Sequence, residues 1–82
     1  MEIKTTDLYL TAYFLTNNIT PQNIVTQGEN RKKIIFIFSD SQRVSQLMEE
    51  FRSGQAVANI ILFRAKLEYA RDVMFSKLRE FN

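Results

Sequence analysis

Four basic residues in this sequence have side chains that could contact phosphate groups. A triplet follows Asn30 directly and one arginine comes later, which gives the candidate set Arg31, Lys32, Lys33 and Arg43. Such side chains neutralise a phosphate backbone without reading its sequence. A basic triplet is more often a solvated turn that discourages edge aggregation, and Arg43 could instead pair with a nearby acid. The residues alone leave both interpretations open.

Tyrosines and adjacent carboxylates are the other groups whose side chains could take part in binding or catalysis. Tyr9, Tyr13 and Tyr69 could stack on nucleic-acid bases. A tyrosine at the edge of a core, with its hydroxyl group in water, explains each of them more simply. Glu49 and Glu50 are neighbours, so on a helix they point to different sides and cannot act as acid and base on one substrate. None of these residues predicts catalysis.

The residue types on which most enzymes depend are absent. The chain has no histidine, no cysteine and only two glycines. These absences exclude disulfides, the common zinc ligands, an imidazole base, a thiol nucleophile and a glycine-rich phosphate loop. We therefore expect no enzyme activity, no cofactor and no metal site.

Length and charge predict one small soluble domain that spans residues 1–82. The composition is 45% hydrophobic and the formal net charge is +2, which is weak evidence for a nucleic-acid partner because dedicated binders concentrate more charge. No apolar run is long enough to span a bilayer, and no signal-peptide pattern follows Met1. We expect a cytoplasmic protein without membrane contact. A single core is marginal at this size, so packing or self-association must add support.

The first half of the sequence predicts a helix followed by a β-hairpin. Asp7 can accept hydrogen bonds from the first N–H groups of a helix, and Asn17 and Asn18 tolerate the left-handed conformation that ends one. Two β-rich runs follow around a turn, at residues 23–27 and 31–38. The second run is apolar on both faces, as expected for a strand covered on both. Because a two-stranded ribbon is unstable alone, helices must cover it or its edge must pair with a second copy.

The second half predicts two more helices. Ser39, Asp40 and Ser41 form a cluster that can cap a short amphipathic helix, which Gly54 ends. No glycine or proline interrupts the chain from residue 55 or 56 to about Phe81, so we expect a long terminal helix there. The expected fold is therefore α+β, in the order helix, two-stranded antiparallel hairpin, short helix and long C-terminal helix (αββαα).

The long helix is apolar on two sides. At about 100° per residue, the stripe that should cover the chain's own core is Ile60, Phe63, Leu67, Ala70, Met74, Leu78 and Phe81. A second stripe lies on a different side: Ala58, Ile61, Leu62, Ala65, Tyr69 and Val73. Either both shorter helices pack on the long one within one chain, or the second stripe forms a dimer interface. The spacing leaves too few heptads for a coiled coil.

Three segments of the chain carry a family resemblance. They are Thr6-Asp7-Leu8-Tyr9-Leu10 with Ala12-Tyr13, the strand end Ile35-Phe36-Ile37-Phe38-Ser39-Asp40, and the break Phe51-Arg52-Ser53-Gly54. Nearly the whole chain resembles a family of small uncharacterised prokaryotic and phage-borne domains of unknown function. The resemblance implies an αββαα fold and cytoplasmic residence in a bacterium, an archaeon or their viruses, and it supplies no catalytic residues. Thr11 and the connection at residues 19–21 depart from the family pattern.

Two functions of different classes follow from these features. The first is a non-enzymatic interaction module that acts as a homodimer, through the long C-terminal helix or the hairpin edge, and offers a surface to another protein. The alternative is a small nucleic-acid-binding regulator whose dimer aligns two copies of the basic hairpin and of Arg43. Phosphate contacts weaken steeply with salt and apolar contacts do not, so salt dependence distinguishes the two.

Overall fold

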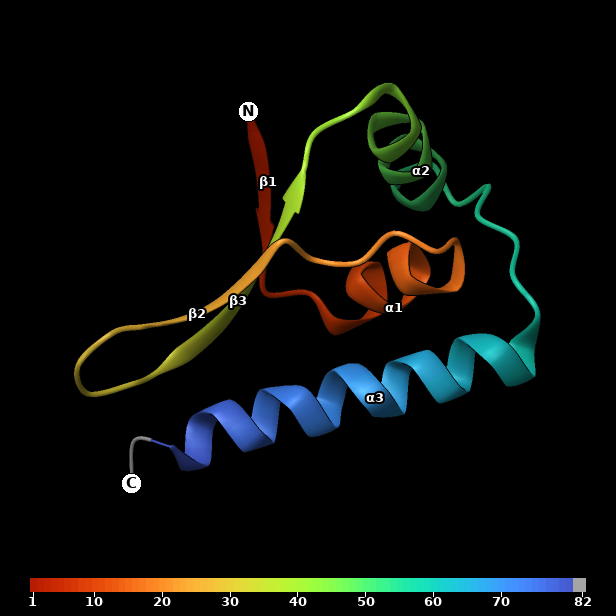
Figure 1. Cartoon of the computed structure of the whole chain (residues 1–82). Coiled ribbons are helices and arrows are strands. Elements are labelled where there is room, and N and C mark those ends of the chain that lie inside the picture. Colours follow the sequence, from red (N-terminus) through yellow and green to blue (C-terminus); the bar gives the residue numbers. More distant parts are fainter. Residues whose placement is uncertain (81–82) are drawn as a thin grey trace.

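A three-stranded antiparallel sheet forms one end of the protein, two short helices lie at the other, and the long C-terminal helix runs alongside both (Figure 1). The computed structural model describes residues 1–80. The elements follow in the order β1 (Glu2–Thr5), α1 (Leu8–Thr16), β2 (Asn23–Gln27), β3 (Lys33–Ser39), α2 (Gln42–Arg52) and α3 (Ile60–Arg79). An α+β fold is confirmed, but a strand precedes the expected αββαα order.

β3 is the central strand, because it pairs with β1 on one edge and with β2 on the other. The expected hairpin is present as β2 and β3, but the expectation of a two-stranded sheet is wrong, because the segment before the first helix adds a third strand. Pairing places Ile3 opposite Phe38 and Ile24 opposite Phe36, and residues opposite one another share a face of the sheet. This shared face packs against the helices. On the reverse face Ile37 is buried and Ile35 is partly buried.

Side-chain caps fix where the first two helices begin. The Asp7 carboxylate accepts hydrogen bonds from the N–H groups of Tyr9 and Leu10, at 2.8 and 3.2 Å. The Ser41 hydroxyl group caps α2 in the same way. These bonds satisfy N–H groups that have no partner inside a helix. Asn18, whose φ is 64°, lies just past the end of α1 as its sequence predicts.

α3 begins later than its sequence predicts. The expected start was residue 55 or 56, whereas the helix starts at Ile60 and residues 55–59 are not helical. The Asn59 side-chain oxygen accepts a hydrogen bond from the Leu62 N–H group at 3.0 Å. Asparagine is among the best N-cap residues. The start of α3 is therefore set by this cap and not by a glycine or proline. The expected end at Phe81 lies outside the described residues.

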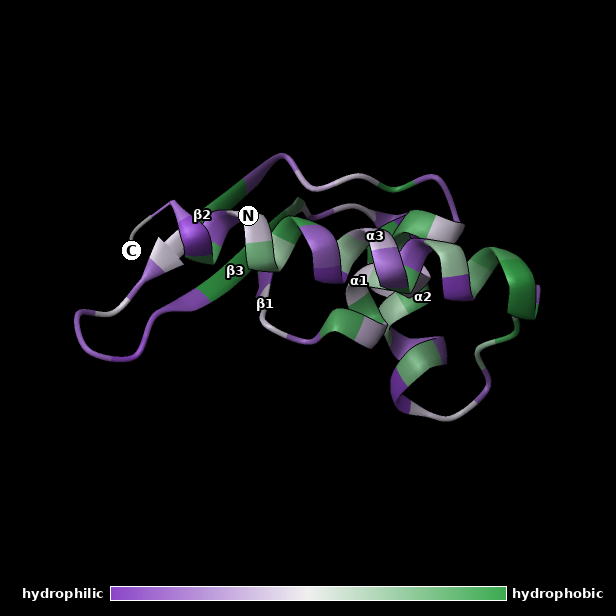
Figure 2. Cartoon of the chain, turned by 90° about the horizontal axis from the view of Figure 1, so that it is seen from below, coloured by the Kyte–Doolittle hydropathy of each residue, from purple (hydrophilic) through white to green (hydrophobic). Residues whose placement is uncertain are grey.

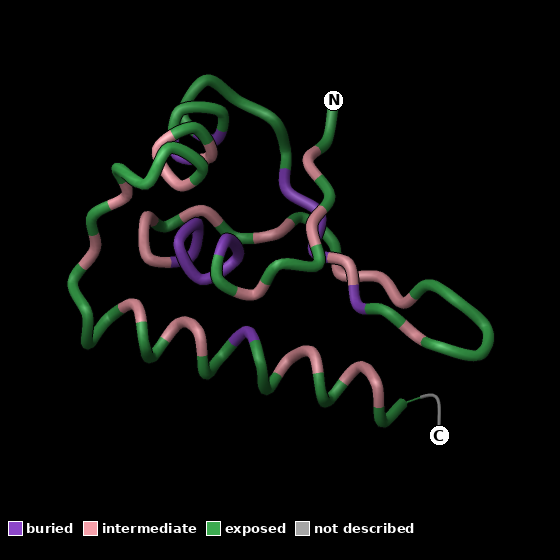
Figure 3. Tube along the Cα trace, turned by 180° about the vertical axis from the view of Figure 1, so that it is seen from behind, coloured by how far each residue is buried: buried purple, intermediate pink, exposed green. Residues whose placement is uncertain are grey.

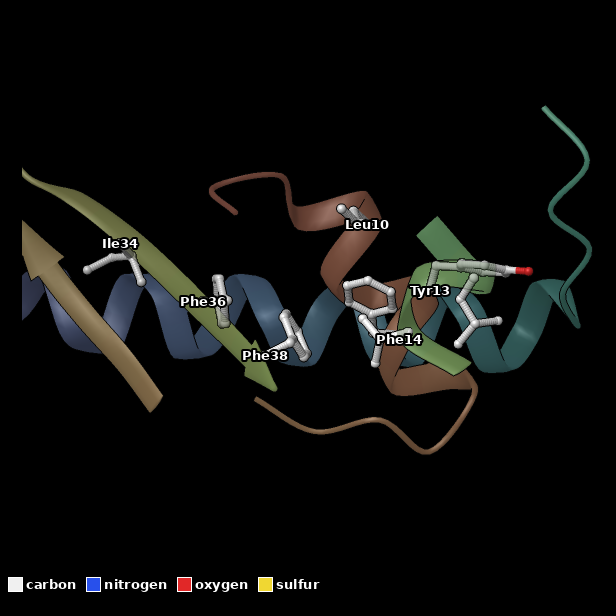
Figure 4. Packing of buried hydrophobic residues seen from close by; sticks show 8 residues of the cluster. Leu10, Tyr13, Phe14, Ile34, Phe36 and Phe38 are labelled. Atoms are coloured by element: carbon white, nitrogen blue, oxygen red, sulfur yellow. The ribbon is translucent and has the colours of Figure 1, made fainter. Parts of the chain in front are cut away.

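Aromatic residues of α1 and β3 meet at the centre of the core (Figure 4). The rings of Phe14 and Phe38 pack edge to face with centroids 4.6 Å apart, and both side chains are fully buried. Every residue from Leu10 to Leu15 is buried, which makes α1 the most buried helix (Figure 3). The complete core cluster is Leu10, Tyr13, Phe14, Ile34, Phe36, Phe38, Val44 and Leu47. α1 thus joins the sheet, α2 and α3.

One side of α3 packs against this core, as its first stripe predicts. Ala70 is fully buried, and Phe63, Met74 and Leu78 pack against the core cluster. Ile60 is the exception, with 82% of its surface exposed, because the first turn of α3 extends past the end of α1 (Figure 1). No helix within residues 1–80 combines the length and the apolar character needed to cross a membrane.

Candidate interaction surface on helix α3

The side of α3 that faces away from the core carries the second apolar stripe. Ile61 is 80% exposed, Tyr69 is 59% exposed and Leu62 is 42% exposed. Ala65 lies between them and is also exposed. At about 100° per residue these four side chains point to one side of the helix. We call Ile61, Leu62, Ala65 and Tyr69 the outer face of α3.

Two members of the predicted stripe lie elsewhere. Ala58 precedes the helix, in the extended segment that connects α2 to α3, and packs against the core. Val73 is on α3 but is partly buried and also packs against the core. The structure therefore brings four of the six predicted residues together on an open surface. It directs the other two toward the chain's own interior.

The open apolar surface continues at the start of α3, where the sequence did not predict it. Val57 is 86% exposed and Ile60 is 82% exposed. Figure 2, in which α3 lies in front, shows the strongest hydrophobic colouring of this helix at its first turn. Together with the outer face these side chains expose on the order of 500 Å², which is near the upper end for the largest patch on a monomeric protein. Asn59 was the sequence signal that could have shown where α3 begins, because asparagine is a favoured N-cap residue.

Charged side chains flank the outer face of α3. Arg64 and Glu68 form an ion pair one helical turn apart, with 3.6 Å between Nε and Oε1. Their side chains are 80% and 60% exposed, so the pair contributes little to stability. Asp72 is exposed near the outer face, and the first turn of α3 contains no acidic residue. This surface therefore carries both signs of charge beside its apolar centre.

A hollow of about 250 Å³ lies beside the start of α3. Its lining is almost entirely apolar and consists of Tyr13, Phe51, Ala56, Ala58, Ile60 and Phe63. The Tyr13 hydroxyl group donates a hydrogen bond to the Glu50 carboxylate at 2.9 Å. Burial, followed by this hydrogen bond, raises the pKa of Tyr13 above its ordinary value. A tyrosine that holds its proton this firmly does not serve as a base at neutral pH.

The structure does not gather the four basic residues that could contact phosphate. Arg31 and Lys32 lie in the turn between β2 and β3 and Lys33 begins β3, whereas Arg43 is in the first turn of α2. β3 lies between the two positions, and at about 3.3 Å per residue its seven residues span roughly 20 Å. Arg43 also donates a hydrogen bond to the Asn17 side chain at 3.2 Å. The basic residues therefore form two separate groups.

The chemical groups needed for metal binding are also dispersed. Within residues 1–80, no three acidic side chains come close enough to hold a metal ion. Glu49 is exposed, and Glu50 is already engaged by Tyr13 and by Gln46 at 3.4 Å. The outer face of α3 is thus the feature of the described chain that best fits a functional surface.

Comparison with known proteins gives one match. A family model described as a domain of unknown function, DUF5659, matches residues 1–76. This match covers every strand and helix except the last residues of α3, and it confirms the resemblance to a family of small uncharacterised domains. No curated protein and no solved structure matches the chain.

Proposed function

We propose that this chain, which belongs to the DUF5659 family of domains of unknown function, is a non-enzymatic interaction module that works as a homodimer through the outer face of α3. The observation that carries the proposal is the exposure of Ile61, Leu62 and Tyr69 on one side of a well-anchored helix. The opposite side of α3 is fixed on the core by Ala70 and Phe63. The helix therefore holds its open side rigidly, as a preformed interface requires.

The size of the open surface suits self-association. If the outer face and the charged side chains that flank it bury about 500 Å² of each copy, the interface totals about 1,000 Å², which is the lower limit for a specific protein contact. Water contact with the apolar part of this surface is costly for so small a domain, since its whole stability is of the order of 5–10 kcal/mol. Covering the outer face with a second copy removes that cost.

The absence of an enzyme activity belongs to the same proposal. The sequence contains no histidine and no cysteine, and the hollow beside α3 has an apolar lining. Tyr13 lines this hollow, and its hydroxyl group is hydrogen bonded to Glu50 and keeps its proton. The surface is suited to contact with another protein surface and offers no paired acid and base for a reaction.

Sedimentation velocity over the micromolar concentration range tests the proposal. We expect a reversible monomer–dimer equilibrium in the wild type, with little response to salt because the contact is mainly apolar. Ala65→Glu places a charge at the centre of the outer face and should give a monomer. Gln42→Glu, which adds the same charge at an exposed position on α2, is the matched control and should leave the dimer intact.

Two outcomes contradict the proposal. A wild-type chain that stays monomeric throughout this range has no self-association to explain. A dimer that persists unchanged in Ala65→Glu has its contact elsewhere, for example at the edge of β2, which pairs with β3 on one side only. Circular dichroism of each variant separates loss of the dimer from loss of the fold.

A further inference from the structure

We infer that the two copies meet with their α3 helices antiparallel and with the twofold axis beside Ala65. This inference rests on the proposed function and specifies its geometry. It depends on three features of α3: the order of the charges along the helix, the spacing of the large side chains about Ala65, and the absence of acidic residues in the first turn.

The order of the charges disfavours a parallel, in-register pair. The twofold axis of such a pair runs along the helices, so only residues on the line of contact lie beside their own copies, while Arg64 and Glu68, on one flank, face the opposite flank of the partner. Asp72 lies about 20° around the helix from Ala65, close to that line, so it would meet the partner's Asp72. Like charges held close together at an interface cost several kcal/mol. A parallel arrangement therefore places two like charges together at Asp72.

Reversing one helix separates the two Asp72 side chains and brings Arg64 near the partner's Glu68. With the axis beside Ala65 and a rise of about 1.5 Å per residue, Arg64 lies within about 3 Å, along the helix, of the partner's Glu68. In an antiparallel pair the same flank of both helices comes together, so the two side chains can meet. The intrachain pair between Arg64 and Glu68 is exposed, so redirecting it to the partner costs little. The symmetry generates the contact twice.

The same geometry matches the large apolar side chains. Ile61 and Tyr69 each lie four residues from Ala65, so each is about 6 Å from the axis, on opposite sides. Ile61 therefore lies level with the partner's Tyr69, and Leu62 lies beside the same ring. The methyl side chain of Ala65 lets the two helices approach closely at the axis. Each copy thus covers the exposed tyrosine of the other.

Asp72 also gains a favourable position in the antiparallel pair. It lies seven residues from Ala65, which places it about 1.5 Å along the axis from the level of the partner's Asn59. Asn59 caps the N-terminus of α3, where the partial positive charge of a helix is concentrated. The first turn of α3 contains no acidic residue. The partner's carboxylate supplies the negative charge that this end of the helix lacks.

Disulfide cross-linking distinguishes the two orientations, because the sequence contains no cysteine of its own. In the antiparallel dimer, Ala65→Cys should link to its own copy under mild oxidation. Ile61→Cys and Tyr69→Cys should not link when oxidised singly, because like positions lie about 12 Å apart along the helices and a disulfide requires a Cα separation below about 7 Å. A mixture of Ile61→Cys and Tyr69→Cys proteins should give a linked heterodimer. Ile60→Cys, on another side of the helix, is the negative control.

The cross-links and the sedimentation experiment together distinguish failure of the proposed function from failure of this inference. A monomeric wild type overturns the proposed function and this inference together. A dimer in which Ile61→Cys and Tyr69→Cys each link to themselves is parallel, so it overturns only the inference. A dimer without any Ala65→Cys link has its axis elsewhere and also overturns the inference alone. Sedimentation of each reduced variant beforehand shows that the cysteine substitution has preserved the dimer.

Discussion

Truncation of Ile61 gives the most direct measure of the contact on the outer face of α3. Ile61→Ala removes three carbon atoms from a side chain that is 80% exposed in the single chain. The fold should not depend on these atoms, and alanine is a better helix former than isoleucine. Any large effect must therefore come from a second molecule.

The size of the effect follows from the exposed fraction. Removing three buried carbon groups costs about 2.4 kcal/mol at 0.8 kcal/mol each, and scaling by the exposed fraction gives about 2 kcal/mol per copy. The twofold symmetry doubles this to about 4 kcal/mol per dimer. We therefore expect the dimer Kd to rise roughly a thousandfold.

Ile60→Ala is the matched control for this measurement. Ile60 is the same residue type, it is adjacent in sequence and it is 82% exposed, but it lies about 100° around the helix from Ile61 and outside the outer face. Sedimentation equilibrium of both variants gives the two Kd values directly. The reasoning is refuted if Ile60→Ala weakens the dimer as much as Ile61→Ala, or if neither changes the Kd.

Three further predictions address stability and the alternative function. The pKa of Tyr13 is higher in the folded chain than in the unfolded chain, where it is near 10. The free energy of unfolding should therefore fall as pH rises above about 10. Urea denaturation across this range should show that Tyr13→Phe flattens the fall, while Tyr9→Phe, at an exposed position outside the outer face, leaves it unchanged. In urea at neutral pH, Gly28→Ala should destabilise the chain by well over 1 kcal/mol, because the added Cβ would meet the carbonyl oxygen of the Arg31 backbone at a position with φ of 103°. Gly54→Ala should cost about 1 kcal/mol, because φ is 79° but the space around it is open; equal losses at the two sites would contradict this account. In low salt, fluorescence anisotropy with duplex DNA or RNA should show no binding, because the basic residues form two separate groups. Binding with a log–log salt slope of several units would instead favour the regulator.

The sequence was sufficient for the elements that have strong local signals. The caps at Asp7 and Ser41 and the left-handed residue at Asn18 fix their helix boundaries through bonds within a few residues. The continuous apolar run at residues 34–38, made of isoleucine and phenylalanine, likewise predicts a buried strand. Local chemistry therefore predicted α1, the hairpin, α2 and most of α3.

The remaining features depend on contacts between distant segments. β1 has four residues and Ile3 is its one large apolar side chain, so its strand character comes only from pairing with β3. The four residues of the outer face were predictable, because periodicity shows that Ile61 and Tyr69 cannot lie on the same side as Ala70. The exposure of Ile60 was not, since it depends on how far α3 extends past α1.

The burial of six consecutive residues of α1, Leu10 to Leu15, has a consequence for motion. Six consecutive helical residues cover the whole circumference of a helix, so this short helix touches a neighbour in every direction. Its amide hydrogens can reach solvent only when the surrounding layers separate together. Hydrogen exchange along Leu10 to Leu15 should therefore report the global unfolding equilibrium, while the amides in the first turn of α3 exchange through local fraying.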